Sequence, residues 1–179
     1  MNASPPKGSG VTEPGLDSCT VQRVGADAAA AAVAILCEAA AWAAARSAPV
    51  WTPDELRLED FRAAADAQEL VIGFAGATPA ATMLLQAADR VYWPEAAPGS
   101  ALYVHKVAVR RAYAGQQWVG RLIEFAAADA RRRNIGRLRL DTILRPPLRE
   151  LYERLGFTVI PEEPLLMRGR RMIRMERLL

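Results

Sequence analysis

Two side chains suited to proton transfer, His105 and Tyr152, lie on either side of a segment rich in amide groups. His105 is the only histidine of the chain, and an imidazole, with an ordinary pKa of about 6.5, can accept a proton near neutral pH. A phenol such as that of Tyr152 ionises only near pH ~10, so it stays protonated there and can donate one. The segment between them, residues 114–120, reads Ala-Gly-Gln-Gln-Trp-Val-Gly. It precedes an apolar helical pattern, and a helix N-terminus can hold a phosphate group.

The patterns around these residues predict a β-α-β-α unit. Residues 102–109 form an apolar strand that carries His105, and residues 138–143 form a second strand. A short helix follows within residues 151–157. The first helix of the unit has four apolar residues on one side, namely Leu122, Ile123, Phe125 and Ala126. Such a unit can bind a phosphate-bearing cofactor where its first helix begins.

The remaining patterns predict an α/β (α+β) fold. Strands are expected at residues 18–24, 70–75, 80–86, 157–160 and 171–178, and helices at residues 28–45 and 54–67. Residues 76–79 form the turn of a hairpin, and residues 87–100 form a loop. The inward residues are expected to be Val33, Leu36, Cys37 and Ala40 on the first helix and Leu56, Phe61 and Ala64 on the second. Together these elements predict a mixed, mostly antiparallel sheet with helices on both faces.

Length and composition predict a single folded domain. The chain has 179 residues, of which 51% are apolar, enough to bury a sizeable core. Residues 1–16, rich in Gly, Pro and Ser, are predicted to be a flexible tail, and residues 17–179 the domain. No apolar run reaches the roughly 18 residues of a membrane span, and the N-terminus lacks an apolar signal region, so we expect a cytoplasmic protein without a membrane partner. Cys19 and Cys37 form neither a disulfide framework nor a metal motif, so we expect core side chains and no metal.

Charge is unevenly distributed along the chain. Residues 1–100 carry six basic and twelve acidic side chains, whereas residues 101–179 carry seventeen and eight. The basic half suits a polyanion, either a phosphorylated cofactor or a nucleic acid. It is equally consistent with a solvated surface, because 21 of the 23 basic residues are arginine in an Ala/Arg-rich composition. The basic residues are scattered and form no nucleic-acid-binding motif, so nucleic acid is not expected to be the main partner.

The order and spacing of residues 103–157 resemble the acetyl-CoA-binding core of the GCN5-related N-acetyltransferase (GNAT) superfamily. The resemblance implies that backbone N–H groups bind the diphosphate of acetyl-CoA at Gly115, Gln116, Gln117, Trp118, Val119 and Gly120. The family pattern Arg/Gln-x-x-Gly-x-Gly/Ala is altered here, because Ala114, Gln117 and Val119 stand at its three defined positions. Gln117 and Val119 carry Cβ atoms where the family leaves room for phosphate oxygens. The loop is therefore consistent with normal binding, with weakened binding, or with a plain strand-to-helix connection.

The same resemblance implies further cofactor contacts and a catalytic acid. Backbone groups of the strand at Val107, Ala108 and Val109 would pair with the amides of the pantetheine arm. Tyr152 falls where the family places a hydroxyl near the cofactor sulfur as general acid; the alternative is a buried packing residue. Arg145 stands where the family commonly has an asparagine that contacts the cofactor, and its guanidinium could reach a phosphate.

The general base is less clearly indicated. Tyr103 stands where the family often has a carboxylate, and His105 lies two residues on, hence on the same face of the strand. His105 is therefore the candidate base, either directly or through water, with a structural histidine as the alternative. Asp141 is a second candidate, and many members of the family need no dedicated base.

The amine acceptor is expected to bind between the first two helices, their connection and the loop before the central strand. Aromatic and acidic residues there could hold a cationic amine, although such residues are also common core anchors and helix-start acids: Trp42, Trp51, Tyr92 and Trp93, with Asp54, Glu55, Glu59 and Asp60. The acceptor would be a small-molecule amine or a protein amine, and homodimers are frequent in the family. The resemblance thus implies an acyl-CoA-dependent N-acetyltransferase acting by direct attack. The alternative is a weak or inactive acyl-CoA-binding or sensor module.

Overall fold

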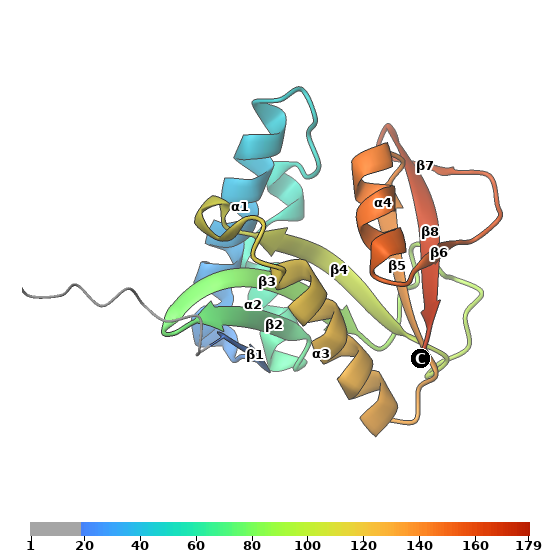
Figure 1. Cartoon of the computed structure of the whole chain (residues 1–179), viewed down its shortest axis with the longest axis horizontal. Helices are drawn as coiled ribbons and strands as arrows, with labels where there is room; N and C mark the ends of the chain where they lie inside the picture. Colours follow the sequence, from blue (N-terminus) through green and yellow to red (C-terminus); the bar gives the residue numbers. More distant parts are fainter. Residues whose placement is uncertain (1–18) are drawn as a thin grey trace, which may run out of the picture.

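A computed structural model describes residues 19–179, so the tail predicted for residues 1–16 lies outside the described residues. The described chain forms one eight-stranded sheet in the order β1-β2-β3-β4-β5-β8-β6, with β7 also paired to β8 (Figure 1). The strands are β1 (Cys19–Arg23), β2 (Leu70–Ala75), β3 (Thr78–Gln86), β4 (Leu102–Val109), β5 (Arg137–Ile143), β6 (Thr158–Val159), β7 (Leu165–Met167) and β8 (Arg170–Leu178). Neighbouring strands are antiparallel except β4 and β5, which are parallel. The predicted mixed, mostly antiparallel sheet is confirmed.

Helices cover both faces of this sheet. The α-helices are α1 (Ala29–Ala44), α2 (Leu58–Asp66), α3 (Trp118–Arg132) and α4 (Pro146–Arg154), and the 3-10 turns are η2 (Ala26–Ala28), η3 (Pro53–Glu55) and η4 (Arg111–Tyr113). Adjacent residues of β2 show the two layers: Val71 packs into the core beneath α3, and Ile72 packs into the core beneath α1 and α2. This alternation follows from the two-residue period of a strand that is buried on both faces.

The inward face of α1 differs from the prediction. Its fully buried positions are Ala29, Ala32, Ile35, Leu36 and Ala43. Cys37, predicted to lie in the core, is exposed, and Cys19 is half-buried at the edge of the α3-side core. Alanine is apolar on every side of this helix, so the sequence pattern did not define which stripe would be buried.

By length and composition alone, the helical segment Ala26–Ala44 is 19 residues long and apolar enough to cross a membrane. The expectation that no apolar segment reaches that length was therefore wrong for this segment. In the described structure one side of the segment packs against α2 and the sheet, with Ile35 and Leu36 wholly buried. The segment thus serves here as a core helix of the domain.

The second predicted helix is divided in two. Residues 54–67 form η3 and then α2, separated at Leu56 and Arg57. Leu56, Phe61 and Ala64 are buried, as expected. The short hairpin partner β7 was not predicted, because residues 161–167 contain two prolines and only a three-residue strand.

Asp129 fastens α3 to the first strand, and its removal is expected to destabilise the fold. Its buried carboxylate accepts hydrogen bonds from Arg23 at 2.7 Å and from Arg132 at 2.8 Å. Burial alone would raise the pKa of this carboxyl, but the hydrogen bond and charge of Arg23 outweigh burial and hold it below its ordinary value of 3.8. The carboxylate therefore stabilises the folded state fully above pH 3.8, the ordinary pKa of the group. This contribution to stability is lost as the pH falls through the lower pKa that the carboxyl has in the folded protein.

We expect Asp129→Asn to lower the free energy of unfolding by about 2 kcal/mol at pH 7. Urea denaturation of both proteins at pH 7 and pH 3 measures the effect. The difference should shrink at pH 3, where the Asp129 carboxyl of the unfolded chain is largely protonated and that of the folded protein is less so. Asp60→Asn, which alters an exposed carboxylate paired with Arg57, is the control and should change stability little. A difference between wild type and Asp129→Asn that is the same at both pH values would contradict the assignment.

Candidate functional site

The parallel strands β4 and β5 separate halfway along their length. Their ladder joins Leu102–Val104 to Leu138–Leu140 and does not continue within the described residues, although β4 runs on to Val109 and β5 to Ile143. Figure 1 shows the two strands diverging, with α3 beside one and α4 beside the other. On its other side, β4 remains paired with β3 up to Val109. The free edge of β4 can therefore pair with an extended, amide-bearing molecule, as an added strand would.

A bulge changes the direction of β4 where it leaves β5. His105 pairs with Leu84 and Ala108 pairs with Thr82, so Lys106 and Val107 together face one residue of β3. Lys106 takes a left-handed conformation with φ 52°, which costs a non-glycine residue about 1 kcal/mol or more. Such bulges are common beside functional sites, where they re-aim side chains. The predicted cofactor strand Val107–Val109 thus begins inside the bulge, at the open edge of β4.

The loop between β4 and α3 has the backbone shape expected of a phosphate-binding turn. Gly115 has φ 81° and Gln117, at the N-cap of α3, has φ 59°. Gln117 therefore takes the conformation that a glycine at this position would favour. No side chain caps the N-terminus of α3, and the first N–H groups of a helix have no partner within the helix. These N–H groups, together with the helix dipole, make this end of α3 suited to an anion.

The side chains of this loop lie partly in the core. Trp118 is buried and packs edge-on against Tyr113 with ring centroids 6.3 Å apart. Val119 is half-buried against the same core, whereas Gln116 and Gln117 are exposed. Two of the three residues that differ from the family pattern are thus placed differently: the Val119 side chain packs inward, and the Gln117 side chain is exposed at the surface.

Tyr152 lies on α4, in the α3-side core that lines the separated strands. It packs edge-on against Phe157, with ring centroids 5.9 Å apart. Burial, with a further effect from the negative charge of Asp141, raises the pKa of the Tyr152 hydroxyl well above its ordinary value. The phenol is therefore fully protonated at neutral pH and can act only as a proton donor. The fold is consistent with both interpretations of Tyr152, because a buried residue at this position can also donate a proton.

His105 and Asp141 lie where the strands begin to separate. Each is the first residue of its strand beyond the last ladder pair, Val104 with Leu140. Nδ1 of His105 lies 3.1 Å from Oδ1 of Asp141, and Nε2 lies 3.6 Å from Oδ2 of Asp89. The two candidate bases are therefore in contact, with a second carboxylate beside them.

Asp89 was not predicted as a site residue. It lies in the loop 87–100, and its Oδ1 accepts hydrogen bonds from the backbone N–H groups of Val91 and Tyr92, both at 2.9 Å. Only 8% of the residue is exposed. The sequence offered one indication, since aspartate commonly binds backbone N–H groups two residues ahead in a turn. Nothing in the sequence placed that turn against β4.

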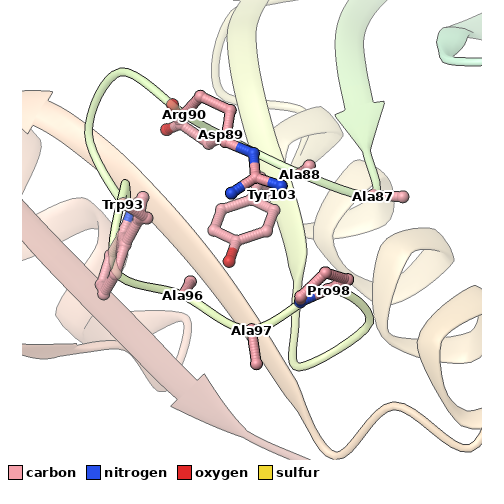
Figure 2. A pocket seen from close by; sticks show the side chains of 9 residues that line it. All are labelled: Ala87, Ala88, Asp89, Arg90, Trp93, Ala96, Ala97, Pro98 and Tyr103. Atoms are coloured by element: carbon pink, nitrogen blue, oxygen red, sulfur yellow. The ribbon is translucent and has the colours of Figure 1, made fainter.

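The loop that carries Asp89 encloses Tyr103. Figure 2 shows residues Ala87 to Pro98 curving around the Tyr103 ring, with Trp93 and Pro98 on opposite sides. A cavity of about 10 Å³ lies beneath this loop, about enough for one water molecule. Trp93, predicted at the acceptor site, is instead buried against Tyr103 with the guanidinium groups of Arg139 and Arg174 over its ring. Of the two interpretations of Trp93, acceptor contact or core anchor, its burial favours the core anchor.

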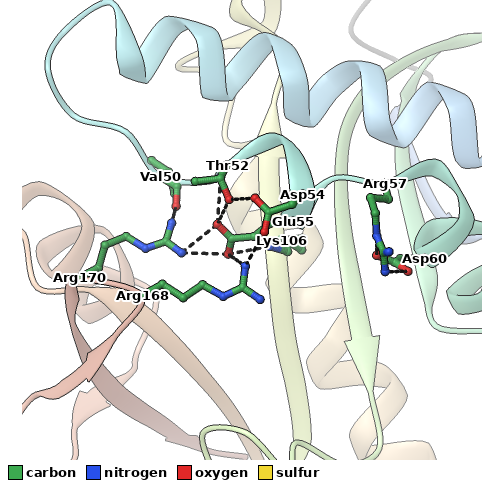
Figure 3. Close-up of polar contacts among 9 residues, drawn as sticks. All are labelled: Val50, Thr52, Asp54, Glu55, Arg57, Asp60, Lys106, Arg168 and Arg170. Atoms are coloured by element: carbon green, nitrogen blue, oxygen red, sulfur yellow. Dashed lines mark hydrogen bonds and ion pairs between the residues drawn. The ribbon is translucent and has the colours of Figure 1, made fainter.

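A polar network closes the other side of the separated strands. Glu55 of η3 accepts hydrogen bonds from Arg170 of β8 at 2.8 Å and lies 3.7 Å from Nζ of Lys106 (Figure 3). Burial alone would raise the pKa of Glu55, but the backbone N–H of Thr52 and the Arg170 guanidinium lower it. Burial lowers the pKa of Lys106, although Glu55 partly offsets this. The Arg170 guanidinium also donates to the carbonyl oxygen of Val50, which ties the α1–η3 connection to β8.

Some of the other residues predicted for the acceptor site are half-buried, and the others lie at the exposed surface. Tyr92 is half-buried against the cluster of Trp93 and Tyr103, and burial and the charge of Asp141 raise its pKa to about 12. Trp51 lies beneath Lys106, whose Nζ is 5.6 Å from the ring centroid. The carboxylates of Asp54, Glu59 and Asp60 lie at the exposed surface, and Trp42 is half-exposed between Arg46 and Arg111. Glu55 and Trp51 are thus the predicted acceptor residues that contact Lys106 in the bulge of β4.

Arg145 spans the gap at the end of β5. It is the N-cap residue of α4, and its guanidinium donates to the carbonyl oxygens of Ala48 at 2.8 Å and Pro49 at 3.2 Å. The side chain thus holds the α1–η3 connection against β5. The predicted contact with a phosphate remains a prediction, and it would require these two hydrogen bonds to be shared or broken.

Comparisons with known proteins agree with this geometry. The family model described as the acetyltransferase (GNAT) family matches residues 36–157. No curated protein sequence matches the chain. An acetyltransferase of the GNAT family from Listeria monocytogenes is 18% identical, with a TM-score of 0.74 over 90% of this chain and 95% of that one.

Two similar structures contain the cofactor. The PaiA N-acetyltransferase of Thermoplasma acidophilum, in complex with coenzyme A, is 12% identical, with a TM-score of 0.70 over 90% of this chain and 99% of that one. YncA of Salmonella typhimurium, with its cofactor acetyl-CoA, is 16% identical, with a TM-score of 0.68 over 91% and 95%. At these identities the structures establish a shared fold.

Proposed function

Because the chain belongs to the acetyltransferase (GNAT) family, we propose that it transfers an acetyl group from acetyl-CoA to an amine by direct attack of the amine on the thioester. The observation that carries the proposal is the separation of β4 and β5, which opens beside the uncapped N-terminus of α3 and next to Tyr152. These three features supply an edge for the pantetheine amides, N–H groups for the diphosphate and an acid near the reacting atoms. Relatives of the same fold hold coenzyme A or acetyl-CoA, which supports acetyl-CoA as the co-substrate.

Each residue of the site has a distinct role in this proposal. Acetyl-CoA supplies an activated acetyl group as a thioester. The N–H groups at the start of α3 bind the diphosphate, and the open edge of β4 at Val107–Val109 holds the arm. His105, alone or through water, takes a proton from the acceptor ammonium so that the neutral amine can attack the thioester, and Asp141 orients the His105 ring. Tyr152 gives its proton to the departing sulfur, which leaves as a neutral thiol.

A weak or inactive acyl-CoA-binding module is the second candidate function. One observation favours it: Gln117 stands in a left-handed conformation where the family pattern has glycine. The strained backbone there costs about 1 kcal/mol, and the exposed side chain lies beside the N–H groups that would bind the diphosphate.

Binding of acetyl-CoA is expected to raise the melting temperature. At a cofactor concentration 100 times Kd, ligand binding adds about 2.7 kcal/mol, or about 5–10 °C for a chain of this size. Differential scanning fluorimetry with acetyl-CoA, coenzyme A and pantetheine measures the shift. Pantetheine, which lacks the diphosphate, is the control ligand and should give little or no shift.

The matched variant for this titration is Gln117→Gly, which removes the side chain and keeps a positive φ without strain. If the variant shifts with acetyl-CoA and the wild type does not, the Gln117 side chain has closed the site. If both shift but a broad panel of amines gives no acetylated product, the protein is a binding module. If neither shifts at millimolar cofactor, the proposed function is rejected.

A further inference from the structure

Asp89, His105 and Asp141 converge on one point at the junction of three segments. One oxygen of each carboxylate and one nitrogen of the ring lie within 4.8 Å of one another. From this convergence we infer that the three side chains form a binding site for a divalent first-row transition-metal ion, with Zn²⁺ preferred. The ligand set combines carboxylates, which suit Mn²⁺, with an imidazole, which suits Zn²⁺. Zn²⁺ binds more tightly than Mn²⁺ in a given N/O site.

Neither contact of the His105 ring with these carboxylates is a hydrogen bond. Oδ1 of Asp141, beside Nδ1, and Oδ2 of Asp89, beside Nε2, are both buried without a hydrogen-bond partner. One oxygen of each carboxylate and one ring nitrogen nevertheless lie within 4.8 Å of one another. Ligand atoms at zinc–ligand distances of about 2.0–2.1 Å in a tetrahedral site are about 3.3–3.4 Å apart. Only one ring nitrogen coordinates the ion. Nδ1 lies 3.1 Å from Oδ1 of Asp141, close to that spacing, whereas Oδ2 of Asp89 lies 3.6 Å from the other nitrogen, Nε2, so the Asp89 carboxylate would move toward Nδ1 when the ion binds.

Two carboxylate oxygens in this cluster are buried without a hydrogen bond. They are Oδ2 of Asp89 and Oδ1 of Asp141, and Asp89 is more than nine-tenths buried. Burying a charged oxygen without a hydrogen bond is costly, so these two atoms are suited to binding a cation. The other oxygen of Asp89 is held by two backbone N–H groups. Carboxylates that bind metals are commonly fixed by hydrogen bonds of this kind.

The charges around the cluster favour a bound cation. A histidine that coordinates a metal is neutral, so the bound ion would face the two negative charges of the carboxylates. The nearby basic groups of Lys106 and Arg170 lie against Glu55, at 3.7 Å and 2.8 Å. A divalent ion would neutralise the two remaining carboxylates. A substrate ammonium carries one charge and must enter with the rest of its molecule, whereas the oxygens concerned are already enclosed.

Metal binding would also affect the proposed chemistry. An imidazole nitrogen that coordinates a metal cannot accept a proton, so Zn²⁺ at this site would inhibit acetyl transfer through His105. Binding itself does not depend on the proposed function, since it requires only the three side chains. Failure of the acetyltransferase proposal would therefore leave the metal site testable by direct titration.

The single histidine of the chain makes the test direct. In untagged protein labelled with ¹⁵N in histidine, the His105 ring gives one set of imidazole signals. We expect Zn²⁺ to shift one ring nitrogen at one equivalent, EDTA to reverse the shift, and Mg²⁺ to leave it unchanged. A Cys37→Ser background removes the exposed thiol as a competing ligand. An imidazole spectrum that stays unchanged in excess Zn²⁺ would overturn the proposal.

Variants identify the carboxylates. By calorimetry, Asp89→Asn and Asp141→Asn should each weaken Zn²⁺ binding by about 10-fold or more, whereas Asp60→Asn, at an exposed carboxylate, should not. Circular dichroism checks that each variant is folded. If a variant does not fold, the Zn²⁺ titration of the wild-type ¹⁵N imidazole signals still tests the proposal. Equal affinity in all four proteins would show that Zn²⁺ binds elsewhere. A His105 signal that responds to an amine acceptor but not to Zn²⁺ would assign the cluster to the substrate ammonium instead.

Discussion

Tyr152→Phe is expected to lower kcat for acetyl transfer about 100-fold or more, while the Kd for acetyl-CoA changes less than about threefold. General acid catalysis by a positioned side chain typically contributes a factor of about 10²–10⁴. The hydroxyl is suited to this role because burial and the charge of Asp141 raise its pKa and keep it protonated. Phenylalanine retains the ring that packs against Phe157, so the fold and the cofactor site should remain.

A coupled assay for free thiol at saturating acetyl-CoA gives kcat, and the thermal-shift titration gives Kd. Tyr103→Phe is the matched control, because it also removes a buried tyrosine hydroxyl but lies beneath the loop 87–100. Its kcat should stay within a few-fold of wild type. Wild-type activity should also show no alkaline loss from Tyr152 below pH 10.0, its ordinary pKa. Unchanged turnover in Tyr152→Phe would identify the residue as a packing residue.

The elements that position the site were predictable because each has a strong local pattern. The apolar strand β4, the amphipathic α3 and the strand β5 appear at the expected places. Their order also fixes their neighbourhood, since parallel strands joined through a helix lie side by side with their carboxyl ends at one edge. The strand order therefore implies that His105 and Asp141, the two candidate bases on these strands, lie close to each other.

The sequence did not reveal features that depend on contacts between distant segments. Asp89 becomes a site residue only because a long loop folds against β4. The sequence left Trp93 as either an acceptor contact or a core anchor, and only the structure places it under two arginines, from β5 and β8. The separation of β4 and β5 likewise depends on which residues of the two strands pair. The composition of each strand alone does not indicate where their ladder ends.

The loop before α3 shows how a degraded pattern can retain its backbone shape. The family pattern places glycine where a left-handed residue is needed, and Gln117 takes that conformation at a cost. Val119 turns inward to the core. A loop can therefore keep its backbone shape although its residue types depart from the family pattern. The direction of the backbone N–H groups depends on that shape and not on the side chains.

The packing of Trp118 on Gly73 is expected to give the largest loss of stability on mutation. Trp118 is the first residue of α3 and is buried over β2. A Cβ atom built at Gly73 would lie 2.8 Å and 2.9 Å from two carbons of the Trp118 ring, closer than such atoms approach in real structures. The indole thus occupies the space that a side chain at residue 73 would need, and this contact fixes where α3 begins.

We expect Trp118→Ala to lower the free energy of unfolding by about 3–5 kcal/mol, because it leaves a large cavity in the core. Gly73→Ala should cost about 1–3 kcal/mol through overpacking. In the double variant the new methyl group enters the space left by the ring. The two effects should therefore be less than additive, by at least about 1 kcal/mol.

Urea denaturation of the four proteins measures this cycle. Gly136→Ala is the control, because a Cβ there meets no atom within 4 Å. Additivity within about 0.5 kcal/mol would show that Gly73 is not required by the indole. Because the ring sets the first turn of α3, Trp118→Ala should also weaken acetyl-CoA binding when it is assayed below its melting temperature, whereas Gly136→Ala should not. That result would tie the core contact between β2 and α3 to the position of the N–H groups proposed to bind the diphosphate.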